Sequence, residues 1–156
     1  MKTGLSTDIH ANRETLESVL AHAHANGATA LAFLGDFVGY GADPAWVLDT
    51  VRDFVATGAL AIQGNHDLAT VLGSSPEMRA DAKAVIEWTR AQLSADQLAF
   101  LDELPLSRRH GEKLFVHANA YAPAAWDYVL NAELALRSML ATPCRYTFCG
   151  HMHQPR

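Results

Sequence analysis

Apolar residues recur along this chain with two different spacings, and stretches of the two kinds alternate. Longer stretches carry apolar residues three or four positions apart, as at Leu16, Val19, Leu20 and Ala23, which is typical of amphipathic helices. Short apolar runs typical of strands lie between them, at 1–7, 28–34, 60–63, 113–116 and 145–149. The first run is the weakest, because Leu5 is its only interior apolar residue. Strands that alternate with helices predict an α/β sandwich with a largely parallel central sheet.

Capping residues mark the ends of the predicted helices. Asn12 can cap the first helix, and Pro44 stands in the first turn of the second. Ser94 and Gln97 form a capping box, and Pro105 stops the helix that the box opens. The helical stretches predicted from such signals are 12–27, 43–58, a tract that opens at 75, 94–104 and 131–143.

Residues with metal-binding side chains follow every predicted strand. In open α/β sheets, ligands bind beyond the carboxyl ends of the strands. Five separate strand ends are therefore expected to converge on one place. The residues concerned are, in chain order, Asp8 and His10, Asp36, Asn65 with His66 and Asp67, His117, and His151 with His153.

These residue types indicate a centre of two metal ions. Carboxylate, imidazole and amide donors together suit Mn, Fe, Zn or Co better than Mg or Ca, which prefer oxygen alone. Side chains two residues apart on an extended segment point to the same side, as expected for Asp8 with His10 and for His151 with His153. The two oxygens of Asp36 can bridge two ions, and ions about 3.5–4 Å apart can clamp the attacking and leaving oxygens of a phosphoryl transfer.

Each motif by itself also has an ordinary structural explanation. Gly35-Asp36 is a common turn, and Gly and Asn form turns in many loops. His117 alone could be a core histidine, and a histidine pair near residue 151 could belong to a tail. These explanations would all have to coincide, in order and each at a strand end. The combination therefore favours the metal centre.

Composition narrows the classes of function. The chain has 156 residues, 49% of them apolar and 19% charged, which is typical of one globular domain. No apolar run approaches the roughly 20 residues of a membrane span, and no signal peptide stands out. The net charge of −5 offers no general attraction for nucleic acid. The two cysteines lack metal or redox spacing, which is typical of reduced thiols in a cytoplasmic protein. Together with the apolar runs and the net charge, this leads us to expect a cytoplasmic protein that binds neither membrane nor nucleic acid.

The order D-x-H, G-D, G-N-H-D, H and G-H-x-H resembles the signature of the calcineurin-like metallophosphoesterases. The stretch 35–44 is similar to a branch of small prokaryotic, phosphodiesterase-like members. The resemblance covers essentially the whole chain. It implies a single metallophosphoesterase domain over 1–156, with the four-layer α/β/β/α sandwich of that family.

The resemblance also implies roles for the residues of the motifs. His66, paired with Asp67, would stand beside the substrate and protonate the leaving oxygen, while a hydroxide that bridges the metals attacks phosphorus. Two divalent transition-metal ions are implied, with Mn favoured and Fe, Zn, Co or Ni as alternatives. One ion would take Asp8, His10, Asp36 and His153, and the other Asp36, Asn65, His117 and His151.

The chain differs from the family pattern in three places. The first strand is polar, and Ala118 follows His117 where a glycine is common. The family fold also normally continues past the last motif, whereas this sequence stops at Arg156. We therefore expect the second sheet to be truncated at its carboxyl end. A longer chain, or a second copy in a homo-oligomer, would then cover its edge.

The motifs also indicate a class of substrate. Phosphoprotein phosphatases of this family carry an arginine soon after the second motif, which grips a doubly charged phosphate, whereas 37–41 has no cation. Their third motif usually ends in glutamate, and here it ends in Asp67. We therefore predict hydrolysis of small, nucleotide-like phosphodiesters, with Tyr40 or Trp126 available to stack on a ring of the substrate. Trp126 and Tyr128 are candidates for a wall of the substrate cleft.

Three alternatives remain open at this point. A phosphomonoesterase could take the missing cation from Arg108 or Arg109. A dinucleoside polyphosphate hydrolase would use the same metal centre. A non-catalytic scaffold would keep the fold and bind partners, although the presence of every predicted ligand argues against it.

Overall fold

The computed structural model describes residues 2–154, in which the strands form two sheets of three strands each. Residue 1 of the first predicted strand, and residues 155 and 156 of the predicted domain, lie outside the described residues. The first sheet is parallel and contains, in order, β1 (Thr3–Ser6), β2 (Ala30–Phe33) and β3 (Leu60–Ala61). In the second sheet, the central strand is parallel to one neighbour and antiparallel to the other. Its order is β4 (Ser107–His110), β5 (Lys113–Val116) and β6 (Tyr146–Phe148), with the β4–β5 pair antiparallel.

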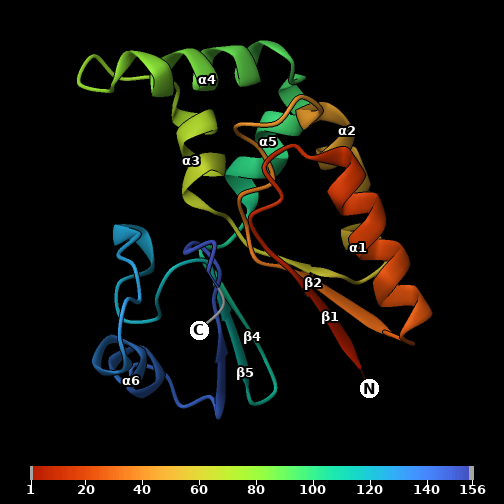
Figure 1. Cartoon of the computed structure of the whole chain (residues 1–156), viewed down its shortest axis with the longest axis vertical. Helices are drawn as coiled ribbons and strands as arrows, with labels where there is room; N and C mark the ends of the chain where they lie inside the picture. Colours follow the sequence, from red (N-terminus) through yellow and green to blue (C-terminus); the bar gives the residue numbers. More distant parts are fainter. Residues whose placement is uncertain (1, 155–156) are drawn as a thin grey trace.

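The layers follow the order α/β/β/α, which confirms the predicted fold class. The helices α1 (Arg13–Ala25) and α2 (Pro44–Ala56) cover one side of the first sheet (Figure 1). The second sheet lies on the other side, and α6 (Ala132–Leu140) lies beyond it. One central sheet was expected from the alternation of elements alone, whereas the family resemblance implied two, and two are present.

Two apolar clusters hold these layers together. One joins Leu16 of α1, Val47 of α2 and Leu101 of α5 (Ala95–Glu103) to Phe33 of β2. The other lies between the sheets, where Phe115 of β5 packs against apolar residues in and after β2 and β3. Its members are Ala32, Leu34, Ile62 and Phe115, with Leu60 and Phe148 against them. The sheets are therefore fixed face to face, and their carboxyl ends lie close together.

The capping residues begin helices as predicted. The side chain of Asn12 accepts a hydrogen bond from Thr15 N–H, and that of Asn131 accepts one from Leu134 N–H. Ser94 and Gln97 form the expected capping box of α5. None of the helices within 2–154 combines the length and the apolar character needed to cross a membrane.

The helix α3 (Asn65–Leu72) is a correction to the sequence prediction, which placed 64–67 directly after the strand 60–63 and put no helix between that strand and residue 75. β3 stops at Ala61, and Asn65 opens the helix directly after the turn. The helix α4 (Ala80–Ala91) also begins later than the predicted start at 75. Arg90 of α4 donates hydrogen bonds to the last carbonyls of α3, so α4 supports the helix that carries the third motif.

The strand β4 was not predicted from the sequence. Its residues, Ser107 to His110, include no apolar residue, and the last three are exposed. The strand exists because its main chain pairs with β5, from Ser107 opposite Val116 to His110 opposite Lys113. An apolar pattern cannot report an edge strand of this kind.

Gly35 brings the ends of β2 and β3 together. Its φ is +88°, and an added Cβ would lie 2.6 Å from the main-chain nitrogen of Gly64. Only a residue without a side chain allows this approach. The second and third motifs meet because of it.

We predict that Gly35→Ala lowers the free energy of unfolding by about 2–4 kcal/mol. The left-handed backbone costs an alanine about 1 kcal/mol, and the clash with main chain adds about 1–3 kcal/mol. Gly27→Ala is the matched control, because Gly27 has a φ of +71° but open space around its Cβ position. Denaturant unfolding measures both. Equal losses in the two variants would show that the contact with Gly64 contributes nothing.

Candidate metal centre

The structure gathers the predicted metal-binding side chains into three overlapping groups. Within each group, the possible ligand atoms lie within 4.8 Å of one another. Asp36 belongs to two of the groups, and so does His10. The groups are Asp8 with His10 and His153, His10 with Asp36 and His66, and Asp36 with His117 and His151.

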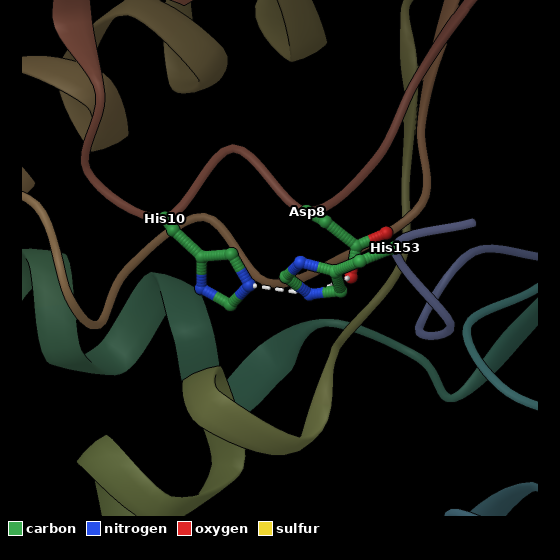
Figure 2. Close-up of side chains that lie close together, drawn as sticks. All are labelled: Asp8, His10 and His153. Atoms are coloured by element: carbon green, nitrogen blue, oxygen red, sulfur yellow. Dashed lines mark hydrogen bonds and ion pairs between the residues drawn. The ribbon is translucent and has the colours of Figure 1, made fainter. Parts of the chain in front are cut away.

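The first group joins the first and last motifs of the chain. Figure 2 shows the rings of His10 and His153 facing each other beside the Asp8 carboxylate. His10 Nε2 and His153 Nε2 are 3.1 Å apart, and His153 Nε2 is 3.4 Å from Asp8 Oδ1. The Asp8 carboxylate also accepts a hydrogen bond from the main-chain N–H of His151, which anchors the last motif to the first.

The other end of the centre is buried between the sheets. His117 is fully buried, and its Nε2 lies 3.3 Å from Asp36 Oδ2 and 3.1 Å from Asn65 Oδ1. His10 Nε2 approaches the same Asp36 oxygen at 3.8 Å. Asp36 Oδ1 accepts a hydrogen bond from the main-chain N–H of His66. The Asp36 carboxylate therefore stands between the two ends of the cluster, where one ligand could serve two ions.

Main-chain carbonyls orient three of the rings. His10 Nδ1 lies 3.2 Å from Val38 O, and His117 Nδ1 lies 2.6 Å from Leu34 O. His151 Nε2 lies 2.9 Å from Trp126 O. A carbonyl can only accept, so each ring donates there, and in the neutral ring the other nitrogen is left as an acceptor.

Whether these residues fit a metal is tested by what the remaining nitrogens of the neutral His117 and His10 rings meet. His117 Nε2 meets the oxygens of Asn65 and Asp36, and His10 Nε2 meets His153 Nε2. Lone pairs that converge in this way need a proton or a cation between them. Imidazole, carboxylate and amide donors suit transition metals, so the residues present fit a metal centre.

The pKa shifts agree with this picture. Burial by itself would raise the pKa of Asp36, but its hydrogen bond to His117 lowers it below the ordinary value. Burial would lower the pKa of His117, and the hydrogen bond to Asp36 raises it instead. Burial lowers the pKa of His10, His66 and His151, which favours the neutral imidazole that metals bind. Because the pKa of His117 is raised, its Nε2 holds a proton more firmly, and a cation that binds this nitrogen would displace that proton.

Left-handed backbone is concentrated at this site. Such conformations cost non-glycine residues on the order of 1–3 kcal/mol each and persist where the surroundings impose them. Ala118 is not among these residues, so that position does not require the glycine common in the family. The non-glycine residues with positive φ within 2–154 are Asp8, His10, Ala11, Asp36, Tyr40, Trp126, His151 and His153.

Asp67 has a different partner from the one expected. Its buried carboxylate accepts hydrogen bonds from the main-chain N–H groups of Asp36, Phe37, Val38 and Gly64, and none joins it to the His66 ring in the described part of the chain. Burial and the nearby Asp36 charge raise the pKa of Asp67 to about 7. The position of Asp67, an acid in the first turn of a helix, could have indicated this main-chain role.

A cavity of about 470 Å³ opens beside these groups. The His66 ring faces it, with the Tyr40 ring 4.7 Å away and the His10 ring 4.9 Å away. Trp126, expected beside the substrate, is not among the lining residues, since its ring meets His117 edge-on at 5.9 Å. The cavity is lined by Asp36, Tyr40, Asn65, His66, Tyr128, Leu130, His151, Met152, His153 and Gln154, and thus by no lysine or arginine of residues 2–154.

Comparisons with known proteins agree with the fold and the motifs. The calcineurin-like phosphoesterase superfamily domain matches residues 1–156. The uncharacterized protein MJ0912 of Methanocaldococcus jannaschii is 36% identical over 128 residues, which are 79% of this chain and 51% of that protein. The crystal structure of a metallophosphoesterase from Sphaerobacter thermophilus is 33% identical, with a TM-score of 0.86 over 99% of this chain and 62% of that one.

A further structure shares the fold at lower identity. It is the crystal structure of a candidate diadenosine tetraphosphatase, 24% identical, with a TM-score of 0.60 over 76% of this chain and 50% of that one. The chain spans about half the length of the curated relative that it matches. Because the family match runs over the whole sequence and one relative shares 36% identity, the chain belongs to the calcineurin-like phosphoesterase superfamily.

Proposed function

We propose that residues 1–156 form a single metallophosphoesterase domain that hydrolyses small phosphodiesters with two divalent metal ions. The observation that carries this proposal is the placement of Asp36 between two clusters of acceptor atoms, beside a cavity with no lysine or arginine among its described walls. Mn is our first choice of metal, with Fe, Zn, Co and Ni as alternatives, because the donors mix nitrogen and oxygen.

The residues divide between two metal positions that share Asp36. When bound, the ions would lower the pKa of a water molecule and offset the charge that develops on the phosphoryl oxygens. One position would use Asp8, His10, Asp36 and His153, and the other Asp36, Asn65, His117 and His151.

His66 is our candidate for the general acid. Its ring lines the cavity beside Asp36 and His10, where it can hold a proton for the leaving oxygen. Burial lowers the pKa of the ring, and the negative charge of a bound phosphate acts in the opposite direction. Asp67 is a positioning residue, because its carboxylate ties the segment at Asp36 to the start of α3.

The lack of lysine and arginine in the described walls of the cavity favours a diester over a monoester. A doubly charged monoester gains from arginine or lysine beside the phosphate, and a singly charged diester needs less compensation. Arg108 and Arg109 lie on β4, are exposed and do not line the cavity, so they do not supply the missing charge in this conformation.

A dinucleoside polyphosphate hydrolase is the second candidate, supported by the likeness in fold to the candidate diadenosine tetraphosphatase. The scaffold alternative is disfavoured by the convergence of the predicted ligands, including Asn65 beside His117. A cytoplasmic location, the lack of a nucleic-acid partner and a homo-oligomeric state stay predictions from the sequence.

We predict that Asp36→Ala removes more bound metal than His10→Ala and abolishes hydrolysis. In the proposed assignment Asp36 is the one ligand shared by both metal positions, whereas His10 serves one of them. Elemental analysis of the purified variants after dialysis measures the metal content, and circular dichroism checks that both are folded. Retention of two tightly bound metals by Asp36→Ala would overturn the assigned arrangement.

We predict that His66→Ala keeps its metal content but loses about 10²–10⁴-fold in rate, as is usual for loss of a general acid. The loss should shrink for nitrophenolate, a leaving group that needs little protonation. Steady-state kinetics with esters of good and poor leaving groups test this. If the loss is the same for both kinds of ester, His66 positions the substrate rather than protonating it.

We predict that the Mn²⁺-loaded protein has a higher kcat/KM for bis(p-nitrophenyl) phosphate than for p-nitrophenyl phosphate. The two esters release the same chromophore, so the comparison isolates the charge and the second substituent. A clear preference for the monoester would refute the diesterase assignment and leave the metal centre standing.

A further inference from the structure

Tyr40 is held over one end of the metal centre by its backbone. It has a φ of +64°, lies between Gly39 and Gly41, and is 69% exposed. A Cβ on Gly39 would lie 2.7 Å from the His66 ring, and the N–H of Gly41 donates to the carbonyl of His10. The Tyr40 ring consequently lies 4.7 Å from both the His10 and the His66 rings.

Tyr128 holds the corresponding position at the other end. Its ring is stacked on His151, with centroids 4.3 Å apart and planes 12° apart, and the residue is 50% exposed. The buried Asn119 fixes the loop that carries it, because its side chain bonds to the main chain of Ala122 and Asp127. Trp126 also anchors this loop, because its main-chain carbonyl accepts a hydrogen bond from the His151 ring.

The two tyrosines therefore stand on opposite sides of Asp36. Tyr40 adjoins the group of His10, Asp36 and His66, whereas Tyr128 adjoins His151 of the group around His117. Both tyrosines line the same cavity, in which a phosphate bound at the proposed metal positions around Asp36 would lie between them. A half-exposed ring beside a catalytic centre offers a face on which a planar substituent can stack.

We propose that Tyr40 and Tyr128 are two stacking platforms, so that the preferred substrate is a phosphodiester with a planar ring on each side of phosphorus. This inference rests on the proposed function. Since His66 adjoins Tyr40, the leaving group stacks on Tyr40 and the retained substituent on Tyr128. Water adds to phosphorus, the P–O bond on the Tyr40 side breaks, and the leaving oxygen takes a proton. The products are an alcohol and a phosphomonoester.

Two substrates that differ only in the retained group test this assignment. They are p-nitrophenyl methyl phosphate and thymidine 5′-(p-nitrophenyl phosphate), which release the same nitrophenolate. Tyr128→Leu should lower kcat/KM about tenfold for the thymidine ester, the size of one stacking contact, and leave the methyl ester nearly unchanged. Tyr40→Leu should lower kcat/KM for both esters by the same factor, because both carry the ring that stacks there.

Conservative and distant variants complete the design. Tyr128→Phe keeps the ring and should show the wild-type ratio of the two esters, and Tyr40→Phe should keep the wild-type kcat/KM for both. Tyr146→Leu is the control, because Tyr146 is 44% exposed on β6 and does not line the cavity. Metal content and melting temperature are measured for every variant, so that a misfolded or metal-depleted protein is recognised; a Tyr→Leu variant that fails this check is replaced by Tyr→Met.

The outcomes separate this inference from the proposed function. If the wild-type protein hydrolyses both esters but Tyr128→Leu weakens them equally or not at all, the platform assignment is wrong and the phosphodiesterase stands. If the metal-loaded wild-type protein hydrolyses neither ester, the proposed function fails and this inference fails with it.

Discussion

The carboxylate of Asp67 joins the two chain segments that the metal centre needs side by side. It accepts main-chain hydrogen bonds from Asp36, Phe37 and Val38 after β2, and from Gly64 before α3. A buried carboxylate without partners would cost several kcal/mol, so these donors and this acceptor depend on each other. Asp36, Asn65 and His66 take their places because this contact holds the two segments together.

Main-chain groups also hold the histidines of the centre, but here the main chain accepts the hydrogen bonds and the side chains donate them. Main-chain carbonyls of Val38, Leu34 and Trp126 accept from His10, His117 and His151. The other nitrogen of His117 then lies against the oxygens of Asn65 and Asp36, and that of His10 against His153. The left-handed backbone at many of these ligands shows that the fold imposes this arrangement at a cost. A cation that binds the folded chain and not the unfolded one would offset part of that cost.

In the proposed site, different groups would compensate the charge of the phosphate and fit the shape of its substituents. The described walls of the cavity contribute no lysine or arginine, so compensation of negative charge falls to the metal positions around Asp36. Shape is contributed by Tyr40 and Tyr128, which are held by two glycines and by the Asn119 loop respectively. On this division we base the proposal of substrates with low charge and flat substituents.

The sequence by itself determined which residues meet. Predicted ligands follow the carboxyl ends of β1, β2, β5 and β6, and caps such as Asn12 and Ser94 begin helices where expected. Patterns along one segment report its burial and its propensity, which is enough to place such ends and caps.

Only the tertiary structure decided how those residues are held. The pattern did not reveal β4, whose polar residues depend on pairing with β5, or α3, which begins immediately at a motif residue. Nor did it place Asp67 against the main chain of Asp36 or Tyr128 against His151. These contacts join segments that are distant in sequence, and their geometry follows from how the two sheets stack, which local periodicity does not encode.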